Sequence, residues 1–336
     1  MRFARTEEQD LLAATLRTGL ARICPPSVVR AVWHDPGRIG PIWRDLAGLG
    51  LLGILAPEPA GGLGLTELEL AIAFEEAGRV AAPGPLIEAA TIVVPSLLGL
   101  PPSQREVVLA ALEPILDGSR VVTGGTDPSH PIPWAAEAAF CLLRSTQGPR
   151  LLPRSGYDVT PQPSVDATRR LATVRAPHWE GAFSEPSQRA ALAASAMLIG
   201  LGSRMVELAV EYANTRNQFG KPIGSFQAVK HQLVDAHAAV VMARPLVARA
   251  AASIASGAAD ARVSVAMAKA AASDAAELAA KKALQVHGAI GYTTECDLHF
   301  FLKRTWALAR SYGDAGYHRS VVAEHLLDGP TTPESA

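Results

Sequence analysis

Apolar residues recur every three or four positions over two long parts of the chain, which is the spacing of one helix face. In the first part, which ends near residue 117, this spacing is interrupted by loops rich in Gly and Pro. Thr66 is of the residue type that caps a helix N-terminus. The pattern predicts helices over residues 7–21, 41–51, 66–78, 86–98 and 104–116.

The helical spacing fades between about residues 118 and 180, where Pro, Thr, Ser and Val become frequent. The segments VVTGG, AAFCLLR, YDVTP and LATVRA read as short strands between turns. From about residue 181 an alanine-rich helical pattern returns, and Ser225 is expected to cap its second helix. Small residues at facing positions favour a bundle. This part predicts helices over residues 186–214, 225–257, 260–288, 297–311 and 317–327.

Composition narrows the classes of partner and site. The net charge of −1 leaves no basic excess to neutralise phosphates, so no nucleic-acid partner is expected. Cys24, Cys141 and Cys296 are odd in number and far apart, which disfavours a disulfide framework or a zinc site and favours free thiols in a reducing cytosol. No His, Cys, Asp and Glu grouping has metal-ligand spacing. We therefore expect a cytoplasmic protein without a metal, a signal peptide or a membrane span.

Three segments carry a family resemblance. They are residues 42–80, with the loop PEPAGGLGL, residues 216–235, RNQFGKPIGSFQAVKHQLVD, and residues 283–298, ALQVHGAIGYTTECDL. In order and spacing the chain resembles the acyl-CoA dehydrogenase family. The resemblance implies a mainly α fold with an N-terminal helical domain (1–117), a reduced middle β domain (118–180) and a C-terminal four-helix bundle (181–336). It also implies bound FAD, an acyl-CoA thioester substrate and assembly into dimers or tetramers.

The segment that begins at Arg216 resembles the family's flavin-contacting loop. A guanidinium at a loop with two glycines can bind a pyrophosphate in a bidentate manner, although it can also be a solvated charge at a helix C-terminus. The resemblance favours flavin contact, with the FAD held mainly by a partner subunit. It carries this role to Arg216, Gln218 and Phe219, and it implies apolar walls at Ile223, Phe226 and Val229.

Gln285 and Gly288 lie on QVHGAIG, the third segment. Glycine permits close approach of a backbone to a dinucleotide, and Gly288 can also end the preceding helix, so both roles can hold together. The family often has a second glycine where this chain has Ala289. We expect His287 to be a packing or capping residue at the helix end.

The family's reaction needs a carboxylate that removes the substrate α-proton while the β-hydrogen leaves as hydride to the flavin. The two positions that match the family's catalytic Glu are Tyr312 and Ala190, and the acid nearest to Ala190 is Glu185. Tyrosine is a poor base at neutral pH because its reference pKa is about 10. Asp314 falls where the family has a flavin-contacting Thr. It is either a displaced base and cofactor contact or the N-cap of the last helix.

Three functions remain open from the sequence. In the first, the chain is the base-free subunit of an α2β2 heterotetramer, like those that act on CoA thioesters of steroid side chains. A second dehydrogenase-like chain then supplies the Glu, and an electron acceptor reoxidises the flavin. In the second, the chain is a self-sufficient homomeric dehydrogenase that uses Asp314. In the third, it is a non-catalytic structural or acyl-binding subunit. The family's TEP–x–A–GSD stretch is also missing, and VVTGGTDPSHP is the nearest text.

Overall fold

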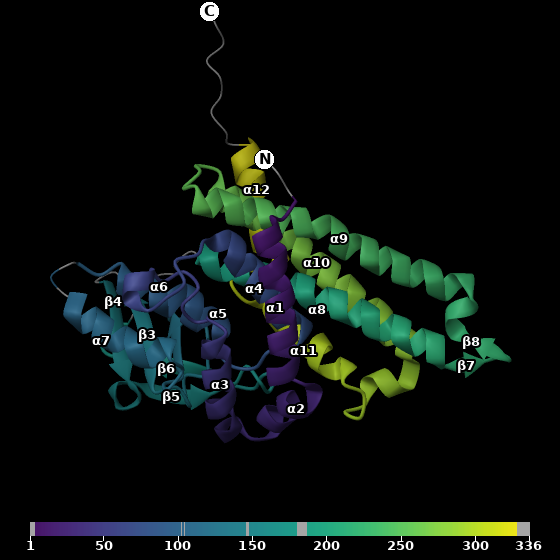
Figure 1. Ribbon diagram of the computed structural model, residues 1–336, viewed down its shortest axis with the longest axis horizontal. Helices are drawn as coiled ribbons and strands as arrows, with labels where there is room; N and C mark the ends of the chain where they lie inside the picture. Colours follow the sequence, from purple (N-terminus) through teal and green to yellow (C-terminus); the bar gives the residue numbers. More distant parts are fainter. Residues whose placement is uncertain (1–3, 102, 104, 146–147, 180–186, 328–336) are drawn as a thin grey trace, which may run out of the picture.

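The computed structural model describes residues 4–101, 103, 105–145, 148–179 and 187–327. Helices dominate both ends of the chain, and a small β section lies between them at the left of Figure 1. Glu185 and the expected helix start at Pro186 lie outside the described residues.

The N-terminal part forms helices close to the predicted ones. They are α1 (Glu7–Ile23), α2 (Pro26–His34), α3 (Ile39–Gly48), α4 (Glu67–Arg79), α5 (Leu86–Glu88), α6 (Val94–Leu98) and α7 (Arg105–Leu116), with short 3-10 turns at Pro36–Arg38 and Glu58–Ala60. The Thr66 cap is confirmed, because its hydroxyl accepts from Leu68 N and Glu69 reaches back to Thr66 N at 3.1 Å. Sequence analysis missed α2, which follows Pro25 and begins with Pro26.

The predicted helix over residues 86–98 contains one wide turn. A π-helical turn, η3 (Ala89–Val93), separates α5 from α6, and Val94 N donates to Ala89 O. Pro95 lies just beyond this turn and has no N–H to continue a regular α ladder. Wide turns of this kind insert one residue into a helix, often beside a functional site. Here the turn directly follows Glu88.

Among its described residues, the middle section contains six strands in two small sheets. They are β1 (Val122–Gly125), β2 (Ile132–Pro133), β3 (Phe140–Ser145), β4 (Gly148–Pro153), β5 (Asp158–Pro161) and β6 (Leu171–Arg175). One sheet has the order β1-β3-β4, with β1 parallel to β3, and the other has the antiparallel order β2-β6-β5. The four predicted strands correspond to β1, β3, β5 and β6, whereas β2 and β4 were missed.

The C-terminal part is a bundle of long helices that ends in a small hairpin at the right of Figure 1. Its elements are α8 (Gln188–Thr215), β7 (Asn217–Gln218), β8 (Lys221–Pro222), α9 (Gln227–Ala255), α10 (Ala261–His287), α11 (Leu298–Arg310) and α12 (Ala315–Leu327), with 3-10 turns at Ile223–Ser225 and Gly288–Tyr292. The expected Ser225 cap is wrong. Its hydroxyl donates to Pro222 O at 2.7 Å, and α9 begins at Gln227 without a side-chain cap.

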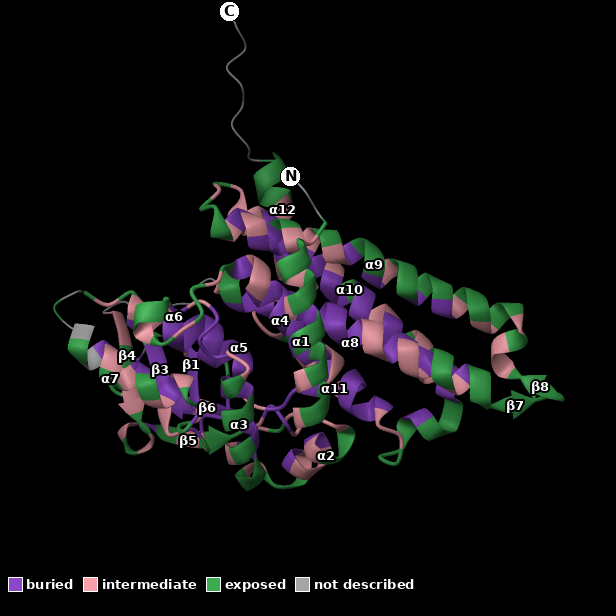
Figure 2. Cartoon of the chain, in the orientation of Figure 1, coloured by how far each residue is buried: buried purple, intermediate pink, exposed green. Residues whose placement is uncertain are grey.

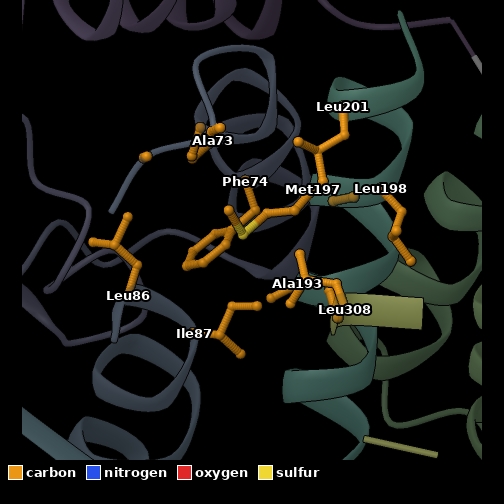
Figure 3. Close-up of a cluster of buried hydrophobic side chains, with 14 of the residues drawn as sticks. Ala73, Phe74, Leu86, Ile87, Ala193, Met197, Leu198, Leu201 and Leu308 are labelled. Carbon is orange, nitrogen blue, oxygen red and sulfur yellow. The ribbon is translucent and has the colours of Figure 1, made fainter. Parts of the chain in front are cut away.

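Helices α4 and α8 join the N-terminal part to the bundle at a close crossing. A Cβ on Gly200 would lie 1.9 Å from Glu75 O, and a Cβ on Gly78 would lie 2.2 Å from Met197 O. Only glycine at these two positions allows the two backbones to approach so closely. Figure 3 shows the core beside this crossing, where Phe74 and Met197 pack together with leucines from α5 and α8.

Helices α8 and α9 are each long and apolar enough to cross a membrane by length and composition alone. The most apolar window of α8 is 72% buried inside the fold, as expected for the central helix of a bundle, whereas that of α9 is 33% buried. The outer face of α9, much of it exposed in Figure 2, includes Val234 (62% exposed) and Met242 (75% exposed). An apolar face of this kind indicates a surface that another layer can cover.

Candidate active site

A cavity of about 550 Å³ lies where the β section meets the turn between α11 and α12. Strands β1, β2 and β6 supply part of its wall, and the α5–π turn segment and the end of α11 supply the rest. The residues that line this cavity include Glu88, Ile92, Arg169, Tyr312, Gly313 and Asp314. Two of the predicted site residues, Tyr312 and Asp314, are therefore in this cavity.

Tyr312 is hydrogen-bonded to Glu88, an acid that sequence analysis did not single out. The Tyr312 hydroxyl donates to Glu88 Oε1, and the Arg169 guanidinium lies 3.3 Å from the same oxygen. Glu88 is 2% exposed and Arg169 is 7% exposed. A buried carboxylate needs such a cation and such a donor to remain charged. Glu88 is thus a satisfied carboxylate that holds Tyr312 in place.

Tyr312 cannot supply the missing base. Burial, and then the negative charge of Glu88, raise the pKa of Tyr312 well above its ordinary value of 10. The phenol therefore keeps its proton at neutral pH and acts as a donor. Glu88 and Tyr312 are separated by 224 positions in the chain, and only the fold brings them together.

The turn that carries Tyr312 has an unusual backbone. Tyr312 has φ +58° and Gly313 has φ +86°, so two successive residues are left-handed. Asp314 follows and caps α12, since its Oδ1 accepts from Tyr317 N at 2.8 Å. The structure thus gives Asp314 the N-cap role that the sequence had left as the alternative to a displaced base.

Ala190, which matches the family's other base position, is fully buried in the first turn of α8 and does not line the cavity. A methyl group cannot accept a proton. The assignment of the family's two Glu positions to Tyr312 and Ala190 stays a prediction from the motifs.

A buried ion pair holds the cavity wall against the helices. Arg304 on α11 binds Asp166 in the loop before β6, and its Nη1 donates to Ala82 O at 2.7 Å. Asp166 Oδ1 also accepts from Thr168 N at 2.9 Å and from its hydroxyl at 2.6 Å. Asp166 is 1% exposed and Arg304 is 3% exposed. The network fixes the loop that carries Arg169.

The residues predicted to contact flavin through the second motif are in a different place. Figure 1 shows β7 and β8 at the outer tip of the α8–α9 pair, away from the β section. Arg216, Gln218 and Phe219 are exposed there, Phe219 at 91%. The predicted apolar walls, Ile223, Phe226 and Val229, are half-buried at the base of the loop. Phe219 packs edge-on against Phe226, with ring centroids 6.2 Å apart, and Lys221 Nζ lies 4.5 Å from the Phe226 centroid.

Gln285 and Gly288 lie at the end of α10, where both are exposed. Gly288 has φ +63°, and no atom lies within 4 Å of a Cβ built on it, so its backbone is open to a ligand. His287 confirms its expected packing role, because Nδ1 donates to Ala283 O at 2.8 Å and the ring stacks on Tyr212 at 4.6 Å. That stacking joins the end of α10 to the last turn of α8, near the Arg216 loop.

The hydrogen-bond donors of the Arg216 loop suit the phosphates of a dinucleotide. Among the described residues, none makes a hydrogen bond or ion pair with the Arg216 guanidinium, which leaves its five donors available for phosphate oxygens. Gly220 in the same loop and Gly288 at the end of α10 each leave room for a backbone approach. Within the described part of the chain, no cluster of three or more His, Cys, Asp or Glu side chains could hold a metal ion.

The helical bundle, the small β section and a cavity at their junction define a flavoprotein dehydrogenase architecture. The acyl-CoA dehydrogenase N-terminal domain matches residues 6–111, and the acyl-CoA dehydrogenase C-terminal domain matches residues 185–327. Acyl-CoA dehydrogenase IpdE2 of Mycobacterium tuberculosis is 32% identical over 308 residues, which cover 90% of this chain and 92% of that protein. This chain belongs to the acyl-CoA dehydrogenase family, and membership of this family supports an oxidoreductase that acts on acyl-CoA.

Solved structures confirm the expected fold. The ChsE4-ChsE5 complex from Mycobacterium tuberculosis superposes with a TM-score of 0.84 at 22% identity, covering 98% of this chain and 100% of the matched chain. A variant of the Tcur3481-Tcur3483 steroid ACAD superposes with a TM-score of 0.83 at 24% identity, covering 96% and 98%. At these identities the likeness establishes the fold.

Proposed function

We propose that this chain is one subunit of an FAD-dependent acyl-CoA dehydrogenase, and that a second dehydrogenase-like chain supplies the catalytic Glu. The assembly is an α2β2 heterotetramer in the cytoplasm, and its substrate is the CoA ester of a steroid side chain. The observation that carries this proposal is the Tyr312–Glu88–Arg169 cluster. It fills the family's base position with a protonated phenol and leaves the nearest carboxylate paired.

The other cavity acids support the same conclusion. Among the described residues, three carboxylates line the cavity. Glu88 accepts from Tyr312 and pairs with Arg169, Asp127 accepts from Ser129 N and pairs with His130, and Asp314 caps α12 through Oδ1. Each is engaged in a structural contact, which favours a base from another chain over a self-sufficient homomeric enzyme.

The separation of the two flavin-related regions supports an assembly. The exposed Arg216 loop and Gly288 would bind the phosphates of FAD, while the cavity of a neighbouring subunit would receive its ring system. Flavin, when bound, supplies the hydride acceptor of the reaction, and an electron acceptor reoxidises it. Gly124 and Gly125, at the end of β1, line the cavity and leave backbone groups near the ring site. The exposed apolar face of α9 offers additional surface for a second chain.

The proposed substrate class of this chain is taken from its structural neighbours. The structural neighbour Tcur3481-Tcur3483 is a steroid ACAD, and ChsE4-ChsE5 is a complex of two differently named chains. Both features, a steroid substrate and paired chains, fit a subunit that lacks its own base.

The test is to purify the chain alone and together with a dehydrogenase-like chain encoded beside it, and to record visible spectra and turnover of steroid side-chain and straight-chain acyl-CoA esters. We expect flavin absorbance and turnover only from the co-purified pair, with preference for the steroid ester. Flavin and turnover from the chain alone would refute the partner requirement. Absence of flavin in both preparations would favour a structural or acyl-binding subunit.

Arg216→Ala tests the loop. If Arg216 binds the pyrophosphate, loss of a bidentate, charge-assisted contact of about 1.5–3 kcal/mol should weaken FAD binding by roughly 10-fold to 100-fold. Arg22→Ala is the matched control, because Arg22, like Arg216, is an exposed arginine at the C-terminal end of a helix. Equal FAD retention by the two variants would show that Arg216 is only a helix-end charge.

A further inference from the structure

Lys269 is a fully buried lysine in the middle of α10, at 0% exposure. Its ammonium has three donors and three acceptors nearby: Ser273 Oγ at 3.2 Å, Ala309 O at 3.2 Å and Gly313 O at 3.0 Å. It does not line the cavity described above. Burial lowers the pKa of Lys269 to about 7, and a lysine is rarely removed from water in this way unless its nitrogen is fully hydrogen-bonded.

Two of these acceptors belong to the turn that carries Tyr312. Ala309 is in the last turn of α11, where helix carbonyls lack partners within the helix and carry partial negative charge. Gly313 O lies directly after Tyr312. Lys269 Nζ therefore binds both sides of the turn from a neighbouring helix.

The turn needs this external support because its backbone is costly. Tyr312 at φ +58° is left-handed, which a residue with a bulky side chain adopts only when the surroundings impose it. A second support comes from His318, whose Nε2 donates to Tyr312 O at 2.9 Å. A Cβ on Gly313 would lie 2.7 Å from that same nitrogen, so the turn has little room to relax.

We propose that Lys269 is a positioning residue of the active site, whose ammonium sets the α11–α12 turn so that Tyr312 reaches Glu88 and Asp314 lies at the cavity wall. Lys269 acts through the turn and touches neither Tyr312's hydroxyl nor the cavity. Lys269 thereby keeps Tyr312, which stands at the family's base position, in contact with Glu88. This role rests on the proposed function, but its test requires no flavin and no partner chain.

The test is a double-mutant cycle on the full-length chain. Tyr312→Phe removes the hydrogen bond to Glu88, and its effect on the unfolding equilibrium constant is measured in three backgrounds. In wild type we expect about a 30-fold to 150-fold change, the upper part of the range for one hydrogen bond to a charged group. In Lys269→Met we expect less than about 3-fold, because the released turn no longer presents the hydroxyl to Glu88.

Ser273→Ala is the matched control background. It removes an acceptor of Lys269 at a site that is 2% exposed but leaves both turn contacts in place, so the full Tyr312→Phe effect should persist. A purely structural Lys269 would lower stability without changing the Tyr312→Phe effect. Equal effects in the wild-type and Lys269→Met backgrounds would therefore overturn the proposal. Lys269→Gln serves for the same cycle if Lys269→Met does not fold.

The two proposals can fail separately. If the chain binds no flavin in any assembly, the proposed function is lost, while the cycle still reports on Lys269. If the co-purified pair binds flavin, Lys269→Met should also shift the flavin absorbance band, because Asp314 and Tyr312 move at the cavity wall. An exposed lysine of the same helix, Lys281, gives the control variant Lys281→Met, which should leave the band unchanged.

Discussion

Replacing Tyr312 by Phe tests whether its hydroxyl holds the buried Glu88 carboxylate. The substitution removes one oxygen and leaves the ring in place beside Arg169, whose guanidinium lies 6.0 Å from the ring centroid. Glu88 then loses its phenol donor and keeps Arg169 at 3.3 Å. Because Glu88 is 2% exposed, water cannot readily replace the lost donor.

The expected cost follows from that geometry. A hydrogen bond to a charged group contributes about 1.5–3 kcal/mol, and an unreplaced donor at a buried carboxylate is at the upper part of that range. The ring contacts are retained, so no cavity term adds to it. We therefore expect Tyr312→Phe to lower the free energy of unfolding by about 2–3 kcal/mol.

Equilibrium urea unfolding measures this difference, with tryptophan fluorescence as the signal. Trp134 is fully buried and reports on the β section beside the cavity. Tyr292→Phe is the matched control, because Tyr292 is 78% exposed and surface substitutions usually change stability by less than about 0.5 kcal/mol. A Tyr312→Phe effect no larger than that of Tyr292→Phe would refute the role given to the hydroxyl.

Two further predictions concern other buried groups. Asp166→Asn should lower the free energy of unfolding by about 3–5 kcal/mol because it leaves Arg304 buried without its anion. The control Asp274→Asn breaks an exposed ion pair and should lower it by less than about 1 kcal/mol. Comparable urea midpoints for the two variants would contradict the value given for Asp166. Burial, and then the charges of Lys303 and Arg30, lower the pKa of His299 from 6.5 to about 4. Between these pH values His299 binds a proton in the unfolded chain but not in the folded one. The free energy of unfolding should therefore fall on acidification from pH 6.5 to 4 by up to about 1.4 kcal/mol per pH unit. In urea unfolding at a series of pH values, His299→Phe should show a smaller fall.

Most of the fold could be predicted because its signals are local. Helices with one apolar face and a capping residue such as Thr66 were found within a few residues of their ends. The failures have physical causes: α2 is short and begins with Pro26, β2 has only two residues, and Ser225 bonds to Pro222 rather than to the helix that follows.

The same contrast between local and long-range signals applies to the candidate site. The prediction that Tyr312 and Ala190 stand at the family's Glu positions could be made by counting along the motifs, since each concerns one position of the chain. Glu88 could not be predicted, because its role depends on Tyr312 and Arg169, which are distant in the chain and close only after folding. Lys269 was not predicted for a similar reason, since a lysine in an alanine-rich helix looks like a solvated charge until its burial is known.

The π-helical turn at Ala89–Val93 has a consequence for how Glu88 could arise or be lost. Each residue advances an α-helix by about 100°, so one extra residue in the wide turn rotates everything before it relative to α6. Deletion of a single residue there would restore the regular ladder and turn the carboxylate away from Tyr312 without changing any side chain of the cluster. The phase of one helix, rather than its composition, therefore decides whether Arg169 and Tyr312 meet a carboxylate in this cavity.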